Sequence, residues 1–416
     1  MSLETTLTQA RLLPIASIFA PGALSVASIL DSSVSMEHVP QIDFSNFNFL
    51  AGMSAFALRT GVDYEESTYA YYGPSLTLKR IALTVAMEQN ILPIIPPYSN
   101  SSWTTVFNGP SPKCEEVDSE MMSHFQKNVA LHMNKTDCYL PPTFLAWYSR
   151  LYKGSPSHGP YGPYGPYEWE EDNATSSLAF QSDTVMDTSL ALESDLREQD
   201  AVLYIASMPD LIDKPQGEYC FDPGSVDNVL RLSTANLSML QCRFHNSTYR
   251  ATFNYINDVQ DVNTSITELG STLKIVPTVV ADSSASCTTF YKFQGPNAPY
   301  KRCEYDPNLL TQLTYQSVFH AFTDFITGNV TIDSLYRLAD TTRIRTTALS
   351  NTKELRYLKE FEDGIDKGFG YETVQAILAN SSSTRSEPPS NQPLSQAMEV
   401  MFRNFTVSLM GSPLFQ

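Results

Sequence analysis

Hydrophobic and polar residues alternate with two different periods along the chain. Short runs rich in β-branched and aromatic residues, separated by turn residues, cover 201–207, 218–221, 228–233, 238–244, 247–256 and 272–280. Such spacing is typical of an antiparallel meander or sandwich. Beyond residue 310 the period lengthens, and the segments 318–326, 353–363 and 393–410 each place apolar residues on one helical face. The pattern therefore predicts an α+β fold with a β-rich body and a C-terminal helical section.

The stretch from Gly73 to Cys114 predicts a turn, the first helix and further strands. Gly73-Pro74-Ser75 indicates a turn with a helix start just beyond it. The apolar residues that follow at helical spacing are Leu78, Ile81, Ala82, Val85 and Ala86. Strands are expected at 42–49, 91–95 and 103–107, and a second Gly-Pro-Ser turn is expected at 109–111.

Apolar stripes define two of the three predicted C-terminal helices. The first consists of Val318, Phe319, Phe322, Phe325 and Ile326, and it is expected to end at Gly328. The second consists of Leu394, Ala397, Met398, Met401, Phe402 and Phe405. Each stripe predicts a helix that buries one face against the rest of the protein.

Changes in composition and in the hydrophobic pattern divide the chain into sections. These are a membrane-proximal extended segment at 1–30, a first part at 31–152, a Gly/Pro/Tyr-rich flexible insertion at 153–183, a β-rich part at 184–310 and the helical section at 311–416. Residues 12–30 are uncharged and about long enough to span a bilayer, but prolines and serines interrupt them, so an extended segment is favoured over a signal anchor. The insertion repeats Gly-Pro-Tyr and favours a solvated loop, with an aromatic ligand platform or a proline-rich recognition site as the alternatives.

Cysteines and glycosylation sequons indicate the secretory pathway. The six cysteines are Cys114, Cys138, Cys220, Cys242, Cys287 and Cys303, an even set as disulfides require. They allow 15 connectivities, of which pairing of neighbours (Cys114–Cys138, Cys220–Cys242, Cys287–Cys303) is a guess. Asn-X-Ser/Thr occurs at Asn100, Asn134, Asn173, Asn236, Asn246, Asn263, Asn329, Asn380 and Asn404. Chance predicts roughly four such sequons, so each is a candidate glycosylated surface position.

Charge and motifs argue against several classes of function. The net charge of −18 disfavours nucleic acid as a partner. His124 and His132 are too far apart on a helix to share a metal without a third ligand, and no cofactor fingerprint occurs in the sequence. The pairs Glu65-Glu66 and Glu115-Glu116 are interpreted as solvated surface rather than glycosidase carboxylates. The segment 257–263 offers oxygen ligands for weak calcium binding but lacks the spacing of a calcium loop.

Several segments resemble a known family. Residues 73–75, 91–93, 107–114, 242–249 and 401–410 are similar to segments of multi-pass membrane proteins of filamentous fungi, some of which are named formylmethionine deformylase-like. The resemblance implies N-terminal transmembrane helices, a long glycosylated ectodomain and a further helix after it. The flanking spans are absent here, so the chain is expected to correspond to the ectodomain alone, from a truncated gene model. Deformylases use an H-E-x-x-H metal helix, which the sequence lacks, and we reject that activity.

Together these observations predict a β-rich, disulfide-stapled ectodomain on the extracellular or luminal face of a membrane. Its expected role is non-enzymatic sensing, adhesion or cell-wall contact, without a cofactor or metal. The expected partners are a membrane, through spans outside the chain, and a cell-surface protein or glycan. The alternative is a secretory-pathway hydrolase acting on carbohydrate, with carboxylates brought together by the fold.

Overall fold

The chain divides into two compact units, Met1–His38 and Val39–Gln416, and every element below belongs to the second unit. The computed structural model describes residues 38–51, 73–123, 125–126, 142–148, 199–209, 237–275, 291–293, 303–305, 307–332, 338–360 and 392–416. The predicted extended segment at 1–30 and the predicted insertion at 153–183 lie outside these residues.

An antiparallel sheet of seven strands organises the described part of the second unit. The strands run in the order β1-β5-β4-β2-β10-β11, and β6 pairs with β5. Their bounds are Ser101–Glu116 (β1), Pro142–Tyr148 (β2), Val202–Ser207 (β4), Ser238–Ile256 (β5), Val259–Thr272 (β6), Gly328–Ile332 (β10) and Leu338–Asp340 (β11). One side of β5 pairs with β1, and the other side pairs first with β4 and then with β6. The sections 31–152, 184–310 and 311–416 therefore contribute strands to the same sheet.

Two small sheets and four short 3₁₀ helices are also present, and residues 119–123, 125–126 and 356–360 are helical, the last within the helix predicted at 353–363. Strand β3 (Gln199–Asp200) pairs with β7 (Lys274–Ile275), and β8 (Tyr291–Phe293) pairs with β9 (Cys303–Tyr305). The 3₁₀ helices are η1 (Phe47–Phe49), η8 (Ile344–Thr346), η9 (Ala348–Asn351) and η10 (Leu409–Gly411).

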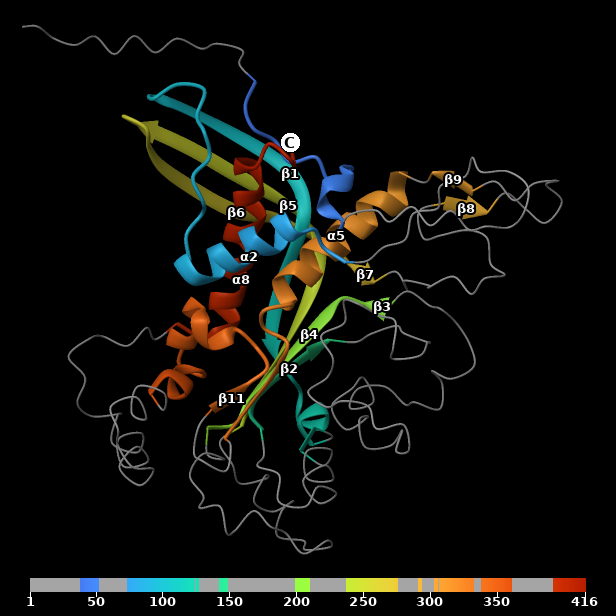
Figure 1. Ribbon diagram of the computed structural model, residues 1–416, viewed down its shortest axis with the longest axis vertical. Coiled ribbons are helices and arrows are strands. Elements are labelled where there is room, and N and C mark those ends of the chain that lie inside the picture. The colour runs from blue at the N-terminus through green and yellow to red at the C-terminus, as the bar shows by residue number, and fades with distance from the viewer. Residues whose placement is uncertain are drawn as a thin grey trace, which may run out of the picture. The chain divides into compact units, whose positions relative to one another are not determined.

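Three α-helices pack beside the main sheet: α2 (Leu76–Glu88), α5 (Pro307–Thr323) and α8 (Leu394–Ser408) (Figure 1). Phe244 of β5 joins the sheet to two of them. Its ring lies edge-on to Phe319 of α5 and to Phe402 of α8, at centroid distances of 4.7 and 5.1 Å. Edge-to-face packing places the positive ring edge against the negative ring face and adds to the stabilisation from burial. The helices and the sheet thus share one core, and the α+β class is confirmed.

The helix predicted just after Gly73-Pro74-Ser75 and the helix predicted within 393–410 are confirmed as α2 and α8. The Ser75 hydroxyl accepts a hydrogen bond from the Leu78 N–H at the start of α2, which satisfies a backbone donor that the helix leaves open. Gln89 ends this helix in the left-handed conformation, with φ of 62°. In α8 the whole predicted stripe from Leu394 to Phe405 is buried. The apolar spacing was sufficient to predict these two helices because each buries a single face.

Two predicted strands, 42–49 and 91–95, do not form. Asn46 accepts a hydrogen bond from the Asn48 N–H through its side chain, and the backbone turns into η1 instead of extending. Between 91 and 95, Pro93 lacks a donor for a ladder, and the Ile94 N–H donates to the Gln260 side chain at 2.7 Å. In both segments a polar side chain takes the backbone group that a neighbouring strand would need.

The stripe from Val318 to Ile326 is buried as predicted, but helix α5 ends at Thr323 and not at Gly328. Gly328 begins β10 with a φ of +130°. A Cβ atom there would lie 2.5 Å from Oγ1 of Thr341, so glycine is required by the close approach of this threonine.

The expected turn at 109–111 is wrong, because these residues lie inside β1. The strand tolerates Pro110 and Pro112 because of their place in the ladder. Cys114 and Cys242 are directly opposite with Cα atoms 4.0 Å apart, the close spacing of a non-hydrogen-bonded pair. Residues 112 and 110 lie two and four positions before 114 and therefore also occupy non-hydrogen-bonded positions. Their nitrogens point away from β5, on the side where the ladder needs no donor. The N–H of Cys114 itself is taken by Glu399 of α8, at 3.0 Å.

Strand β5 joins two runs that the sequence pattern separated, 238–244 and 247–256. Its buried side chains change phase between them. Leu240, Cys242 and Phe244 are buried in one half, and Tyr249, Ala251, Phe253 and Tyr255 are buried in the other. The pairing with β1 is unbroken across this point. Opposite faces of the β1–β5 ribbon therefore meet the core in its two halves, which we call the disulfide half (112–116 with 238–244) and the hairpin half (101–109 with 247–256).

Several polar atoms that meet at the change of phase bond to one another, whereas Oδ1 of Asn246 is buried there without a hydrogen-bond partner among the described residues. The hydroxyls of Ser111 and Ser247 lie 2.6 Å apart, and Tyr249 Oη donates to the Pro110 carbonyl at 2.5 Å. Burial raises the pKa of Tyr249 well above its usual range. The register of β6 against β5 shifts between His245 and Ser247, so the change of phase coincides with a bulge.

One disulfide lies within the described residues, between Cys114 and Cys242. The guessed pairing of neighbours is therefore wrong for Cys114–Cys138 and for Cys220–Cys242. The bond links residues 128 positions apart. Both cysteines are buried in the core beneath α8. The disulfide therefore links distant segments of the chain, whereas the guessed pairing of neighbouring cysteines would have closed short loops.

Replacing Gly270 by alanine is expected to destabilise the sheet. The added Cβ would lie 2.1 Å from the Asn246 carbonyl oxygen, a backbone atom that cannot move without opening the bulge. We expect a loss of about 1–3 kcal/mol in the free energy of unfolding, measured by urea denaturation. Gly109→Ala is the control, because its Cβ meets the end of the Phe44 ring at 3.3 Å, which can shift. Equal stabilities of the two variants would contradict this account.

Removing the disulfide in a Cys114→Ala/Cys242→Ala variant is expected to lower the free energy of unfolding by about 2–5 kcal/mol, because a long loop in the unfolded chain is released. Chemical denaturation of the purified chain measures the change. Glu115→Ala, at an exposed position of the same strand, serves as the control and is expected to be near neutral. A neutral double variant would show that the strand pairing holds without the bond.

Candidate functional site

The hairpin half presents a regular polar surface, which we call the polar face. It is formed by β1, β5 and β6, whose residues lie opposite one another in four rows of three. The rows are Ser102 with Asn254 and Asp261, Thr104 with Thr252 and Asn263, Val106 with Arg250 and Ser265, and Asn108 with Thr248 and Glu268. Strands lie about 4.8 Å apart and successive rows about 7 Å apart in such a sheet, so the side chains of this face are regularly spaced.

Hydrogen bonds between neighbouring strands order the side chains of this face. The hydroxyls of Thr104 and Thr252 are 3.0 Å apart, and Thr248 donates to the Asn108 side chain at 3.0 Å. Cross-strand threonine and asparagine pairs of this kind add to sheet stability. The polar face is thus a preorganised platform of hydroxyl and amide groups.

The reverse side of the same strands is apolar and anchors the platform. Trp103 stacks on Phe253 and Tyr255, at centroid distances of 4.9 and 5.3 Å. Phe107 stacks on Tyr249 at 5.0 Å. Tyr255 Oη donates to the Ile94 carbonyl at 2.7 Å, and burial raises the pKa of Tyr255 to about 12. Side chains therefore alternate strictly between a packed and a solvated face.

The segment 257–263, considered above for calcium, forms the turn and first part of β6. Asn257 and Asp258 have φ of 53° and 64°, the conformation that a two-residue hairpin turn requires. The Asn257 N–H donates to the Asn100 side chain at 2.8 Å, which ties the turn to the start of β1. In the described part of the chain, no group of three or more His, Cys, Asp or Glu residues is placed to hold a metal ion.

The sequons occupy unequal positions. Asn134, Asn173, Asn236 and Asn380 lie outside the described residues. Of the others, Asn100 and Asn263 are exposed, Asn246 and Asn404 are half-buried, and Asn329 is buried. Asn100 lies just before β1 and Asn263 in the second row of the polar face, so the sheet brings two exposed sequons to one part of the surface.

The expected surface position is wrong for Asn329, which is 6% exposed. Its side-chain oxygen accepts a hydrogen bond from the Thr341 hydroxyl at 2.8 Å, within the pairing of β10 with the segment after β11. Asn404 of α8 donates from Nδ2 to the Gln89 carbonyl at the end of α2, at 2.9 Å. These two asparagines hold elements of the fold together.

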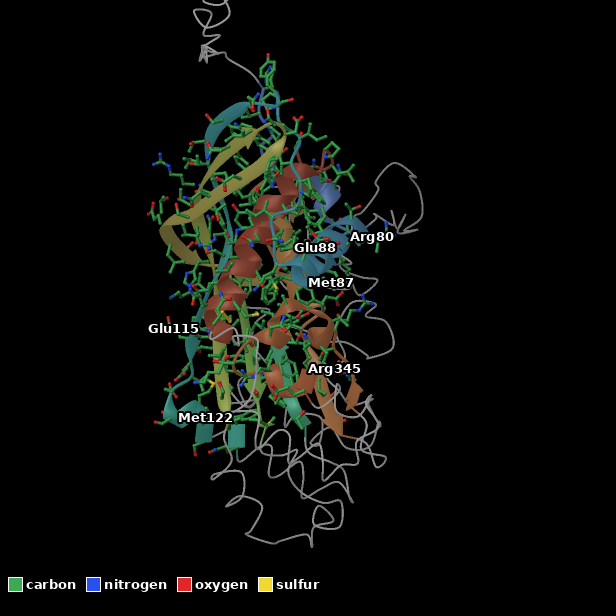
Figure 2. All side chains as sticks on the ribbon, turned by 90° about the vertical axis from the view of Figure 1, so that its left-hand side faces the viewer. Arg80, Met87, Glu88, Glu115, Met122 and Arg345 are labelled. Atoms are coloured by element: carbon green, nitrogen blue, oxygen red, sulfur yellow. A yellow bond between two sulfur atoms is a disulfide. The ribbon has the colours of Figure 1, made fainter. Side chains whose placement is uncertain are left out.

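Most of the other sequence-derived candidates lie outside the described residues. Cys138, Cys220, Cys287, His124, His132, Glu65 and Glu66 lie outside the described residues, and Cys303 lies in β9. Glu115 and Glu116 are exposed at the end of β1, where adjacent residues point to opposite sides of a strand. In Figure 2, Glu115 lies beside β1, on the far side from α2, which carries Arg80 and Met87.

Sequence reasoning missed the polar face because it missed β6. The segment 259–272 contains few apolar residues, and its acidic and amide groups drew a metal-ligand interpretation. Two signals were available. Asn-Asp at 257–258 favours a hairpin turn, and polar residues alternate with aromatic residues or alanine between 248 and 255.

No protein-family model, curated protein or solved structure matches the chain. None of the helices in the described ranges is long and apolar enough to cross a membrane.

The buried tyrosines predict a loss of stability at alkaline pH. Burial raises the pKa of Tyr255 and of Tyr315 to about 12, whereas an unfolded tyrosine titrates near 10. Between these values the unfolded chain releases protons that the folded chain retains, so the free energy of unfolding falls as pH rises from about 10.

Tyr255→Phe is expected to lose about 1 kcal/mol at neutral pH, because the hydrogen bond to Ile94 is removed, and to show a shallower alkaline decline. Denaturation between about pH 8 and 11 measures both effects. Parallel curves for wild type and Tyr255→Phe would contradict the assignment.

Proposed function

We propose that the chain is a non-enzymatic extracellular or luminal domain of a membrane protein, acting in sensing, adhesion or cell-wall contact. The observation that carries the proposal is the buried disulfide between Cys114 and Cys242. Disulfides of this kind form and persist in oxidising compartments and are rare in the reducing cytosol. The bond joins the two longest strands at the level of the core.

The shape of the ordered surface supports a contact role over catalysis. Catalytic sites are concave and gather a few polar groups around the reacting atoms. The polar face instead spreads hydroxyl and amide side chains, with Asp261, Arg250 and Glu268 among them, over three strands, and two pairs of these side chains bond across strands. A surface spread over several strands suits contact with a macromolecule or a glycan.

The resemblance to ectodomains of fungal membrane proteins supports a tether through spans outside the chain. The exposed sequons Asn100 and Asn263 agree with a luminal or extracellular face, since glycans are added there. The acidic net charge of −18 disfavours direct adsorption to anionic lipid. The proposed partners are therefore a cell-surface protein or a glycan.

Peptide mapping of the full chain, secreted from a eukaryotic host, tests the proposed location. Under non-reducing conditions the peptide containing Cys114 is expected to be cross-linked to the peptide containing Cys242, and the two are expected to separate after reduction. A thiol-alkylating reagent applied to the denatured, unreduced chain is the control. If it labels both cysteines in full, the chain is not held oxidised and the proposal fails.

A further inference from the structure

Strand β6 is an exposed edge of the main sheet. Among the described strands it pairs with β5, and its other side has no partner strand. It is 14 residues long and solvent-exposed along most of its length. Unpaired backbone groups on a long edge are a template for pairing with a second chain.

Exposed aliphatic side chains near this edge further favour association with a second chain. Ile256 and Val259 lie opposite each other beside the hairpin turn and are each 69% exposed. Leu269 is 48% exposed near the other end of β6. Natural edge strands are usually protected by lysine, proline, bulges or covering segments. Strand β6 contains neither lysine nor proline, its charged residues are Asp261 and Glu268, and its register shifts lie in the half away from the turn.

Asn263 lies where a covering group would protect the edge. It occupies the exposed second row of the polar face, beside Thr252 of β5, about a third of the way along β6 from the turn. The sequon continues through Thr264 to Ser265, which is also exposed. The side-chain amides of Asn329 and Asn404 are already engaged in the fold, whereas Asn263 stands in solvent.

We propose that Asn263 carries an N-linked glycan that lies over the polar face and the edge of β6 and prevents edge-to-edge association. The inference rests on the proposed location, because the modification requires the secretory pathway. In the transfer, Nδ2 of Asn263 forms a bond to C1 of the first sugar of a lipid-linked oligosaccharide diphosphate. The bond from C1 to the lipid diphosphate breaks, the diphosphate leaves with the electron pair, and Nδ2 loses one proton to solvent.

The glycan accounts for the composition of the surface beneath it. A sugar chain is polar and hydrated, so it rests on hydroxyl and amide groups without desolvating charges. The second row offers Thr104 and Thr252 next to Asn263, and Arg250 is the one basic residue in the four rows. Steric bulk attached to the edge strand blocks a second strand whatever its sequence.

A matched pair of substitutions separates the glycan from the asparagine. Ser265→Ala destroys the sequon and leaves Asn263 in place, whereas Ser265→Thr preserves the sequon at the same exposed position. Both variants and the wild type are secreted as full chains from one eukaryotic host. Glycosidase release in heavy-oxygen water marks occupied asparagines for mass spectrometry, and light scattering during size exclusion measures the mass of the protein part.

We expect Asn263 to be occupied in the wild type and in Ser265→Thr, and both to be monomeric. Ser265→Ala is expected to keep the Cys114–Cys242 bond and to show a concentration-dependent rise of about twofold or more in weight-average mass. A bare Asn263 in a wild type that has the disulfide and glycans elsewhere would overturn the inference and leave the proposed function intact. An occupied Asn263 with equal masses for the two variants would overturn the protective role. Free cysteines and bare sequons throughout would overturn both proposals.

Discussion

The pairing of β1 with β5 is the constraint on which the rest of the structure depends. These strands lie side by side through 16 paired positions, and the disulfide between Cys114 and Cys242 joins them near one end. The prolines of β1 fit because their nitrogens face the outer edge, where Glu399 of α8 accepts the next available N–H. Every other strand of the main sheet is attached, directly or in sequence, to the free side of β5.

Helix α8 packs against both halves of the β1–β5 ribbon because the ribbon buries opposite faces in its two halves. Phe402 meets Phe244 in the disulfide half, and Val407 packs with the aromatic residues of the hairpin half, beside Met410 of η10. Between them, Ser111 bonds to Ser247 and Tyr249 bonds to the Pro110 carbonyl, so these polar groups are satisfied where the change of face brings them into the interior.

The hairpin half combines an anchored side with a free one. The stacking of Trp103 and Phe107 on β5 fixes the strands from beneath, so the polar rows above can be ordered without being covered. The same arrangement leaves β6 at an exposed edge. A glycan at Asn263 would reconcile a long unpaired edge with a soluble surface, and it gives this sequon a physical role that its neighbours in the fold do not share.

The sequence by itself determined helices α2 and α8 and the buried stripe of α5. The stripes of α2 and α8 were readable because a helix is local: its hydrogen bonds close within four residues, and one face is buried. The strand at 103–107 was readable from local alternation, but its extension through Pro110 and Pro112 was not. Whether a proline breaks a strand depends on which side of it pairs, and that is settled by β5, more than a hundred residues away.

Only the tertiary structure decided the disulfide partner, the union of the two runs in β5 and the surface rows. Cys114 has no local signal for Cys242, because register between distant strands comes from the fit of all their side chains together. For the same reason the nine sequons looked alike in sequence. Burial of Asn329 and exposure of Asn263 follow from strand position: β10 lies within the sheet between β2 and β11, and β6 lies at its edge.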